Sequence, residues 1–309
     1  MAALIEERRS RLVVGIDPDP HALWPGALAG VGAVPGATGE GAGEHAAQQG
    51  EDARAATAAA VLAHCEAAIA AVADHCVAAK FQLACFERLG PPGWQALEAA
   101  VAFAKSAGLL VIADGKRGDV PTTSRAYAQA LFGGAEGPFG VLPGLGADAV
   151  TVNPLLGRDA LAPFLDAAEA VGGGCFVLVR TSNPGAGEIQ DEPRGDPLRL
   201  RLARLVDELA NERAPDAELA PIGAVCGATR PELLGELRRA MPRAPILLPG
   251  VGAQGGSASA VRSALGAHPA SALVTAARSI VDAWREEGSP DAAAAAARAA
   301  QRLQRESWT

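Results

Sequence analysis

Short apolar runs alternate with longer polar and apolar segments along most of the chain. The runs span three to five residues, are often β-branched and have no polar alternate face, which is typical of strands buried on both sides. Eight such runs occur, at residues 12–16, 77–81, 109–113, 149–152, 175–179, 222–225, 246–248 and 272–274.

The segments between these runs are rich in Ala, Leu and Arg and have helical spacing. In residues 52–74, for example, Val61, Cys65, Ile69 and Val72 fall on one stripe of a helix. Further helices are expected at 93–107, 159–170, 197–211 and 231–241. Alternating strands and helices imply parallel strands joined by right-handed crossovers, and eight repeats favour a closed (β/α)8 barrel over an open sheet. The pattern therefore predicts an α/β protein, a single TIM-barrel domain over residues 1–309.

One segment, residues 26–50, does not follow this pattern. Fifteen of its 25 positions are Gly or Ala, and few large apolar side chains are available for burial. This composition indicates a flexible surface insertion after the first strand, with an ordered lid as the alternative.

Composition and charge narrow the classes of function. The 309 residues are 49% hydrophobic and carry a formal charge of -8, which disfavours binding to nucleic acid or to an anionic membrane surface. There is no unbroken run of 18 apolar residues, and the charged start does not resemble a signal peptide, so we expect a cytoplasmic protein. Five cysteines without C-x-x-C spacing, and five histidines away from the strand ends, suggest neither disulfides nor a metal site.

Polar residues follow the apolar runs, where a barrel of this kind places its chemistry. Asp17 follows the first run, Lys80 lies in the second, and Asp114 and Lys116 follow the third. Asp114 and Lys116 are two residues apart, so they point to the same side while the strand stays extended. Asp119 lies three residues further on, where the chain should turn. We expect Asp114, Asp119, Lys116 and Lys80 to form a cluster of paired charges, the alternative being a charged surface turn.

Two later segments suggest how a ligand is held. The Gly-rich residues 249–256, together with Arg278 after the last run, predict a phosphate site, because exposed backbone N–H groups and a guanidinium converge there. A nucleoside triphosphate is less expected, since the chain lacks the P-loop pattern. Residues 183–197 form either a surface turn or a mobile cover, near which Ser182 and Gln190 offer groups that could recognise an amide.

Taken in order, these motifs resemble the orotidine 5′-phosphate decarboxylase family, and within it the longer bacterial subgroup called type 2. The resemblance covers nearly the whole chain. It rests on Val-Gly-Ile-Asp-Pro (14–18), Ala-Lys-Phe-Gln (79–82), the D-x-K-x-x-D pattern of Asp114, Lys116 and Asp119, Arg-Thr-Ser-Asn-Pro-Gly-Ala (180–186), Pro-Gly-Val-Gly-Ala-Gln-Gly-Gly (249–256) and Ala-Ala-Arg-Ser-Ile (276–280).

The resemblance implies loss of CO2 from orotidine 5′-monophosphate (OMP) to give UMP, without a cofactor or metal, in a homodimer. It implies that Lys116 donates a proton to C6, that Asp114 faces the leaving CO2 and that Lys80 is its partner. The other implied roles are ribose binding by Asp17, pyrimidine binding by Ser182, phosphate binding by Gln254 and Arg278, and a contribution of Asp119 and Thr123 to the neighbouring subunit's site.

Two alternatives remain open on the residues alone. A related D-x-K-x-x-D barrel acting on a sugar phosphate, such as a keto-gulonate phosphate decarboxylase or hexulose phosphate synthase, would need Mg2+ and further acidic ligands. A barrel that binds a nucleotide without catalysis is the second alternative, against which the intact charged cluster argues.

Overall fold

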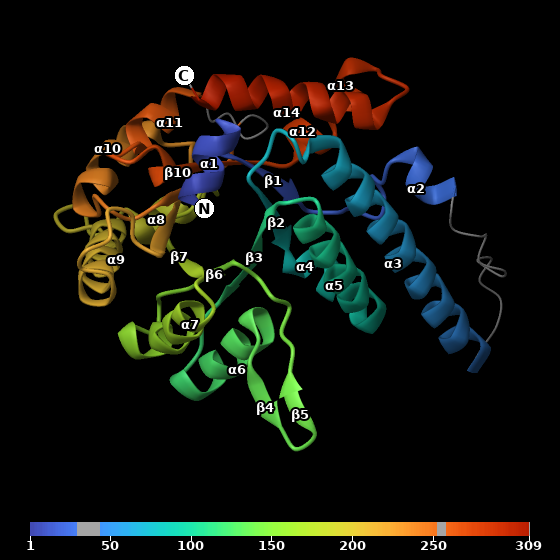
Figure 1. The fold of residues 1–309 in the computed structure, drawn as a ribbon, viewed down its shortest axis with the longest axis horizontal. Coiled ribbons are helices and arrows are strands. Elements are labelled where there is room, and N and C mark those ends of the chain that lie inside the picture. Colours follow the sequence, from blue (N-terminus) through green and yellow to red (C-terminus); the bar gives the residue numbers. More distant parts are fainter. Residues whose placement is uncertain (30–43, 252–257, 309) are drawn as a thin grey trace.

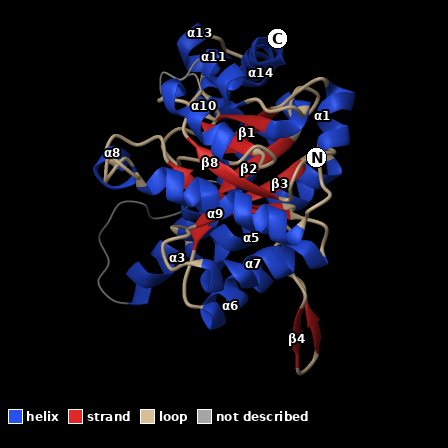
Figure 2. Ribbon diagram, turned by 90° about the vertical axis from the view of Figure 1, so that its left-hand side faces the viewer, coloured by secondary structure: helices blue, strands red, loops and turns tan. Residues whose placement is uncertain are grey.

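Eight parallel strands close into a barrel surrounded by helices (Figures 1 and 2). The structure is a computed structural model that describes residues 1–29, 44–251 and 258–308. Around the barrel, the strands follow the order β1-β10-β9-β8-β7-β6-β3-β2, with parallel pairing throughout. The predicted barrel is therefore confirmed.

Each predicted apolar run coincides with one strand of the barrel. The largest difference is at the third strand, which continues through Arg117 with a register shift after Ala113. The strands are β1 (Leu12–Ile16), β2 (Ala78–Gln82), β3 (Leu110–Arg117), β6 (Ala149–Val152), β7 (Gly174–Arg180), β8 (Ile222–Cys226), β9 (Ile246–Pro249) and β10 (Ala272–Ala276).

Helices follow the strands on the outside of the barrel, and the five named candidates all form. The first of them starts earlier than expected, at Glu44. The helices are α1 (Ala2–Arg8), α2 (Pro25–Ala29), α3 (Glu44–Val72), α4 (Leu83–Glu87), α5 (Gly90–Ser106), α6 (Pro121–Phe132), α7 (Arg158–Ala170), α8 (Ala186–Gln190), α9 (Leu198–Arg213), α10 (Pro231–Ala240), α11 (Ala258–Ala264), α12 (Arg278–Val281), α13 (Ala283–Glu287) and α14 (Ala292–Trp308).

The described parts of residues 26–50 are helical at both ends, as α2 and as the start of α3. The sequence pattern did not indicate these helical ends, and the flexibility of the insertion as a whole stays a prediction. Alanine is the strongest helix former, which explains why an Ala-rich stretch extends a neighbouring helix. The centre of the segment lies outside the described residues.

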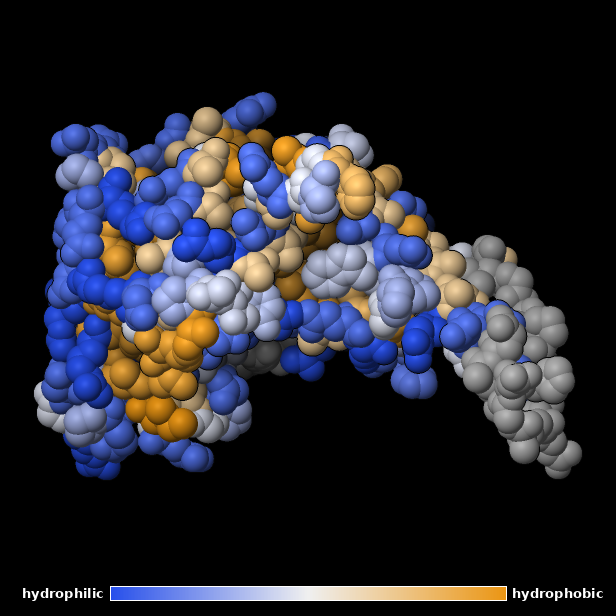
Figure 3. Space-filling model, turned by 90° about the horizontal axis from the view of Figure 1, so that it is seen from below, coloured by the Kyte–Doolittle hydropathy of each residue, from blue (hydrophilic) through white to orange (hydrophobic). Residues whose placement is uncertain are grey.

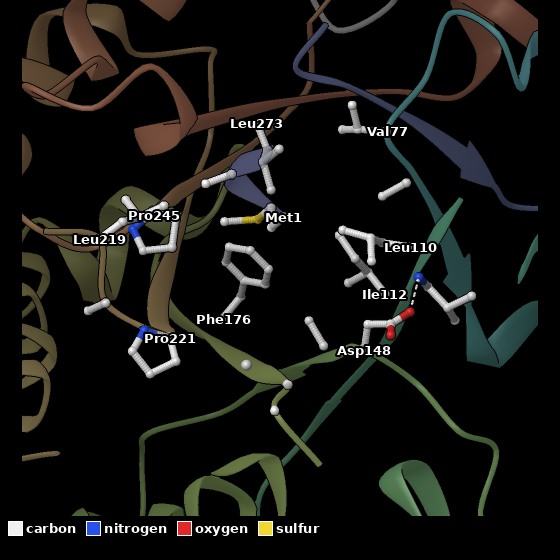
Figure 4. Close-up of a pocket in the computed structure, with 18 residues that line it drawn as sticks. Met1, Val77, Leu110, Ile112, Asp148, Phe176, Leu219, Pro221, Pro245 and Leu273 are labelled. Atoms are coloured by element: carbon white, nitrogen blue, oxygen red, sulfur yellow. Dashed lines mark hydrogen bonds between the residues drawn. The ribbon is translucent and has the colours of Figure 1, made fainter. Parts of the chain in front are cut away.

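A cavity at the N-terminal end of the barrel is mainly apolar (Figure 4). It measures about 320 Å³, and its lining includes Met1, Phe176 and Leu273. Asp148 is its acidic residue, and one of its carboxylate oxygens accepts the Val111 N–H at 2.7 Å. The other side chains that line this cavity are uncharged.

Helix α3 contains a stretch, Gln49–Val72, that is long and apolar enough to cross a membrane by length and composition alone. However, 44% of its most apolar 18 residues are buried inside the protein. Helix α3 also packs against α5 and α14. Helices in the core of a folded protein are commonly as long and as apolar as this stretch, so the packing of α3 against its neighbouring helices explains its composition.

A hairpin of β4 (Ala135–Gly137) and β5 (Gly140–Leu142) projects between α6 and β6, away from the barrel (Figure 1). Phe139 at its turn is fully exposed, as are most of Val141 and Leu142. On the face seen in Figure 3, apolar surface also gathers in patches between hydrophilic regions. Exposed apolar surface of this kind often marks a contact with another molecule.

Candidate active site

A cavity of about 360 Å³ opens at the C-terminal end of the barrel, opposite the apolar one. Inward-facing residues near the ends of several strands form its walls, which is where barrels of this architecture hold their ligands. Its lining residues include Asp17, Lys80, Gln82, Asp114, Lys116, Thr151, Thr181, Ser182, Asn183, Thr275, Arg278 and Ser279.

Asp114 is the centre of the charged cluster in this cavity. Its Oδ2 lies 2.7 Å from the Lys80 Nζ, and its Oδ1 lies 2.6 Å from the Lys116 Nζ. Oδ1 also accepts the Thr151 hydroxyl at 2.8 Å. The side chains of Lys80 and Asp114 are each 7% exposed, whereas that of Lys116 is 41% exposed, so Lys116 is the ammonium that a ligand can reach.

The two lysines keep Asp114 ionised. Burial would raise the pKa of Asp114, but the charges and hydrogen bonds of Lys80 and Lys116 outweigh it and lower this pKa to about 2. For Lys80, burial would lower the pKa, but Asp17 and Asp114 raise it above its ordinary value. Both groups therefore stay charged at neutral pH.

A bend in β3 directs Lys116 into the cavity. Lys116 has a φ of 49°, a left-handed conformation that costs energy for a residue with a side chain. The Thr151 hydroxyl accepts the Lys116 N–H at 2.9 Å while it donates to Asp114. Thr151 thus holds the bend and orients the carboxylate at the same time.

Asp17 and Gln82 complete the cluster. The Asp17 Oδ1 lies 3.4 Å from the Lys80 Nζ, and the Asp17 side chain is 40% exposed at the cavity's edge. With its amide oriented to satisfy both ends, Gln82 donates to the Asp114 carbonyl at 2.7 Å and accepts from the Lys116 Nζ at 3.3 Å. Together, these groups form an extended set of paired charges.

Thr151 and Gln82 were not among the residues expected at the site, since a threonine in an apolar run looks like any other strand residue. One signal could have pointed to this cluster: the chain has only three lysines, at positions 80, 105 and 116, and two of them lie in it.

Of the residues expected to hold the pyrimidine and phosphate, Ser182 and Arg278 line the cavity. Gln254 lies outside the described residues. Gln190 does not line the cavity: its side chain turns back to Thr181, whose N–H it accepts at 2.8 Å.

Asp119 is not part of the cluster within one chain, which corrects the expected quartet, and Asp17 takes its place. Asp119 precedes α6, where its Oδ1 accepts the Val120 N–H at 2.7 Å, and neither it nor Thr123 lines the cavity. The chain turns away from the barrel here because Gly118 packs closely on Asn153, where an added Cβ would come within 2.6 Å of the Asn153 carbonyl.

No histidine is among the described residues that line this cavity. His64 is buried against Trp24, and its Nδ1 accepts the backbone N–H of Trp24 at 3.1 Å. Burial and the nearby Arg285 charge lower the pKa of His64 to about 4. In the part of the chain that the structure describes, no three His, Cys, Asp or Glu side chains are grouped so that they could hold a metal ion.

Comparisons with known proteins agree with this geometry. Residues 10–297 match the family model described as Orotidine 5'-phosphate decarboxylase / HUMPS family. The orotidine 5'-phosphate decarboxylase of Rhodopirellula baltica is 47% identical over 234 residues, which are 74% of this chain and 76% of that protein. The one from Roseiflexus castenholzii is 38% identical over 293 residues, 94% of this chain and 90% of that protein.

The fold agrees as well. The solved structure of Leishmania donovani OMP decarboxylase superimposes with a TM-score of 0.71 at 27% sequence identity, covering 99% of this chain and 97% of that one. With its family model matched over most of the chain and its charged cluster at the barrel mouth, this protein belongs to the orotidine 5'-phosphate decarboxylase / HUMPS family.

Proposed function

We propose that the decarboxylation of OMP to UMP, the activity of this protein, takes place in the cavity at the C-terminal end of the barrel, with Lys116 as the proton donor. The observation that carries this assignment is the position of Asp114, buried between the ammonium groups of Lys80 and Lys116. Such a fixed, alternating arrangement suits a reaction in which negative charge develops on a carbon atom.

Lys116 stabilises that charge and then removes it. When the bond between C6 and the carboxyl group breaks, the electron pair stays on C6 and CO2 leaves. The ammonium of Lys116 attracts this pair and transfers a proton to C6, which leaves UMP and a neutral amine that regains a proton from water.

Asp114 and Lys80 act on the carboxylate side of the reaction. Asp114 faces the substrate carboxylate, and the repulsion between the two anions is relieved when CO2 departs. Lys80 keeps Asp114 in place and ionised, since its Nζ lies 2.7 Å from the Asp114 Oδ2.

Groups further from C6 hold the substrate. Asp17 at the cavity's edge accepts hydrogen bonds from the ribose hydroxyls, Ser182 contacts the pyrimidine, and Arg278 binds the phosphate with Gln254. Binding energy from these remote contacts offsets the cost of bringing the substrate carboxylate next to Asp114.

We further propose that the chain is a type 2 enzyme and works as a homodimer. The Arg-Thr-Ser-Asn-Pro-Gly-Ala segment at 180–186 supports the subgroup. The dimer is supported by Val120, Leu155 and Leu156, large apolar side chains that are 54%, 78% and 44% exposed near Asp119 at the barrel mouth. In such a dimer, Asp119 and Thr123 contribute to the partner's site.

The experiment that tests the chemistry follows the absorbance of OMP with the wild-type protein and two lysine variants. Lys116→Ala should lower kcat by at least about 10^4-fold, because it removes both the proton donor and the charge that stabilises the carbanion. Lys105→Ala, at an exposed position on α5, is the matched control and should turn over OMP like the wild type. Turnover by Lys116→Ala at the wild-type rate would overturn this role of Lys116.

A related barrel that acts on a sugar phosphate would need Mg2+, and this need distinguishes it from an OMP decarboxylase. OMP turnover should be unchanged by EDTA. Loss of activity in EDTA, with recovery on addition of Mg2+, would instead favour a metal-dependent relative of the same family.

A further inference from the structure

An ion pair between a buried arginine and a half-buried aspartate ties the segment after β7, residues 181–197, to the wall of the barrel. Arg180 at the end of β7 is 5% exposed. Its Nε and Nη2 each lie 3.1 Å from one carboxylate oxygen of Asp191, which follows α8. This bidentate contact is directional, and leaving the buried guanidinium without a partner would be strongly destabilising. Asp191 is therefore held firmly against the end of β7.

A second arginine reinforces this contact. The Nη1 of Arg199 on α9 lies 3.1 Å from the Asp191 Oδ1, and its Nη2 lies 3.1 Å from a Glu236 oxygen on α10. Burial would raise the pKa of Asp191, but the hydrogen bond from Arg180 and the charges of both arginines lower it below its ordinary value. Asp191 thus stays ionised and joins the end of β7 to α9.

Gln190, next to Asp191, fixes the first residue of the segment. Its Oε1 accepts the Thr181 N–H at 2.8 Å, and its Nε2 donates to the Thr181 hydroxyl at 2.9 Å. That hydroxyl donates in turn to the Asn183 Oδ1 at 2.6 Å. Arg180 also donates to the Thr181 carbonyl. The backbone and the side chain of Thr181 are therefore both held.

These contacts matter because residues 181–183 line the active-site cavity. On the other side, Ser182 packs against Gly227, where an added Cβ would lie 2.7 Å from the Ser182 Cα. The Thr229 hydroxyl donates to the Ser182 carbonyl at 3.4 Å. The strip that presents Ser182 to the ligand is thus enclosed between the end of β8 and the Gln190–Asp191 pair.

We propose that Arg180, Gln190 and Asp191 are positioning residues that hold residues 181–183 in the geometry that recognises the pyrimidine base of OMP. This inference rests on the proposed function. Gln190 then acts on the ligand indirectly, by holding Thr181, and does not line the cavity itself. Helix α8 in turn supports residues 181–183.

The test compares two competitive inhibitors of OMP turnover: UMP, which carries the base, and ribose 5-phosphate, which lacks it. The variants are Asp191→Asn and Gln190→Met, both close in size to the native residue. Asp196→Asn is the matched control, since Asp196 lies in the same segment but pairs with Arg204 at the surface. Circular dichroism checks that each variant is folded, and Gln190→Met, which leaves the Arg180 ion pair intact, supplies the test if Asp191→Asn does not fold.

For both variants, the inhibition constant of UMP and the KM for OMP should rise about tenfold, the effect of misplacing one or two hydrogen bonds. The inhibition constant of ribose 5-phosphate should stay within about twofold of the wild type, and kcat should change less than KM. Equal losses for both inhibitors, or no change for either, would overturn the positioning role. Absence of OMP turnover by the wild type would instead refute the proposed function.

Discussion

At the scale of single residues, the charge balance of the cluster explains how an acidic protein accepts an anionic nucleotide. The cavity lining includes three positive side chains, Lys80, Lys116 and Arg278, and two negative ones, Asp17 and Asp114, so it carries one net positive charge. In the proposed reaction, the substrate carboxylate balances this charge, and the carbanion at C6 does so after CO2 leaves. The net charge of -8 therefore says nothing about the ligand, because a local excess of one positive charge at the cavity is sufficient.

Thr151 offers a direct test of how the cluster is held. Thr151→Val keeps the shape of the side chain but removes the hydrogen bonds to the Lys116 N–H and the Asp114 Oδ1. We expect a loss of about 1–3 kcal/mol in the free energy of unfolding, and a fall in kcat of about tenfold or more because Lys116 is less well placed. Urea denaturation and steady-state kinetics measure the two effects. A variant with unchanged kcat would show that the bend at Lys116 does not depend on Thr151.

The low pKa of Asp114 predicts how stability depends on pH. This pKa is about 2 in the folded protein, below its ordinary value of 3.8, so the stabilisation is complete above about pH 4 and is lost as the pH falls towards 2. The difference corresponds to about 2–3 kcal/mol. We expect the free energy of unfolding of the wild type to fall more steeply between pH 4 and pH 2 than that of Asp114→Asn. If the free energy of unfolding depended on pH in the same way for both proteins, Asp114 would not be the source of this stabilisation.

At the scale of elements, the strands could be predicted because a barrel strand is covered on both faces and appears as a continuous apolar run. The end of β3 could not, because its bend at Lys116 depends on Thr151, a residue of the next strand in the barrel. Helix α1 and the β4–β5 hairpin were also absent from the prediction. They are too short, and the hairpin too rich in Gly, for periodicity to identify them.

The site residues, too, could be predicted only where the local sequence reveals their position. Asp17, Lys80, Asp114 and Lys116 could be predicted because each lies in or directly after an apolar run. Asp119 follows the same run as Asp114, but the packing of Gly118 on Asn153 turns the chain away from the cavity. Nothing in the local sequence indicates that packing.

Arg238 on α10 shows how one side chain can join several elements. It is buried, and its guanidinium donates to the backbone carbonyls of Ala264, Met241, Pro242, Ala244 and Ser271 at 2.8 to 3.0 Å. Burial lowers its pKa to about 10, so it remains charged.

Arg238→Met should therefore lower the free energy of unfolding by about 3 kcal/mol or more, because several buried carbonyls lose their donor. The exposed neighbour Arg239 is the control, and Arg239→Met should change stability by less than about 0.5 kcal/mol. Chemical denaturation at neutral pH measures both variants. Equal stability of the two would mean that water replaces the arginine at these carbonyls.

At the scale of the whole molecule, the position of Asp119 outside its own cavity leads to a prediction about assembly. If Asp119 acts in the partner's site, a dimer of one Lys116→Ala chain and one Asp119→Ala chain has one intact site, formed by Lys116 of the second chain and Asp119 of the first. Random exchange of equal amounts makes half of the dimers mixed, so about one quarter of the wild-type activity should return. Each variant alone should be nearly inactive. The measurement is OMP turnover after the two proteins are unfolded and refolded together, with separately refolded samples as the control. No recovery, while purification through a different affinity tag on each variant shows that mixed dimers form, would mean that each chain builds its site alone.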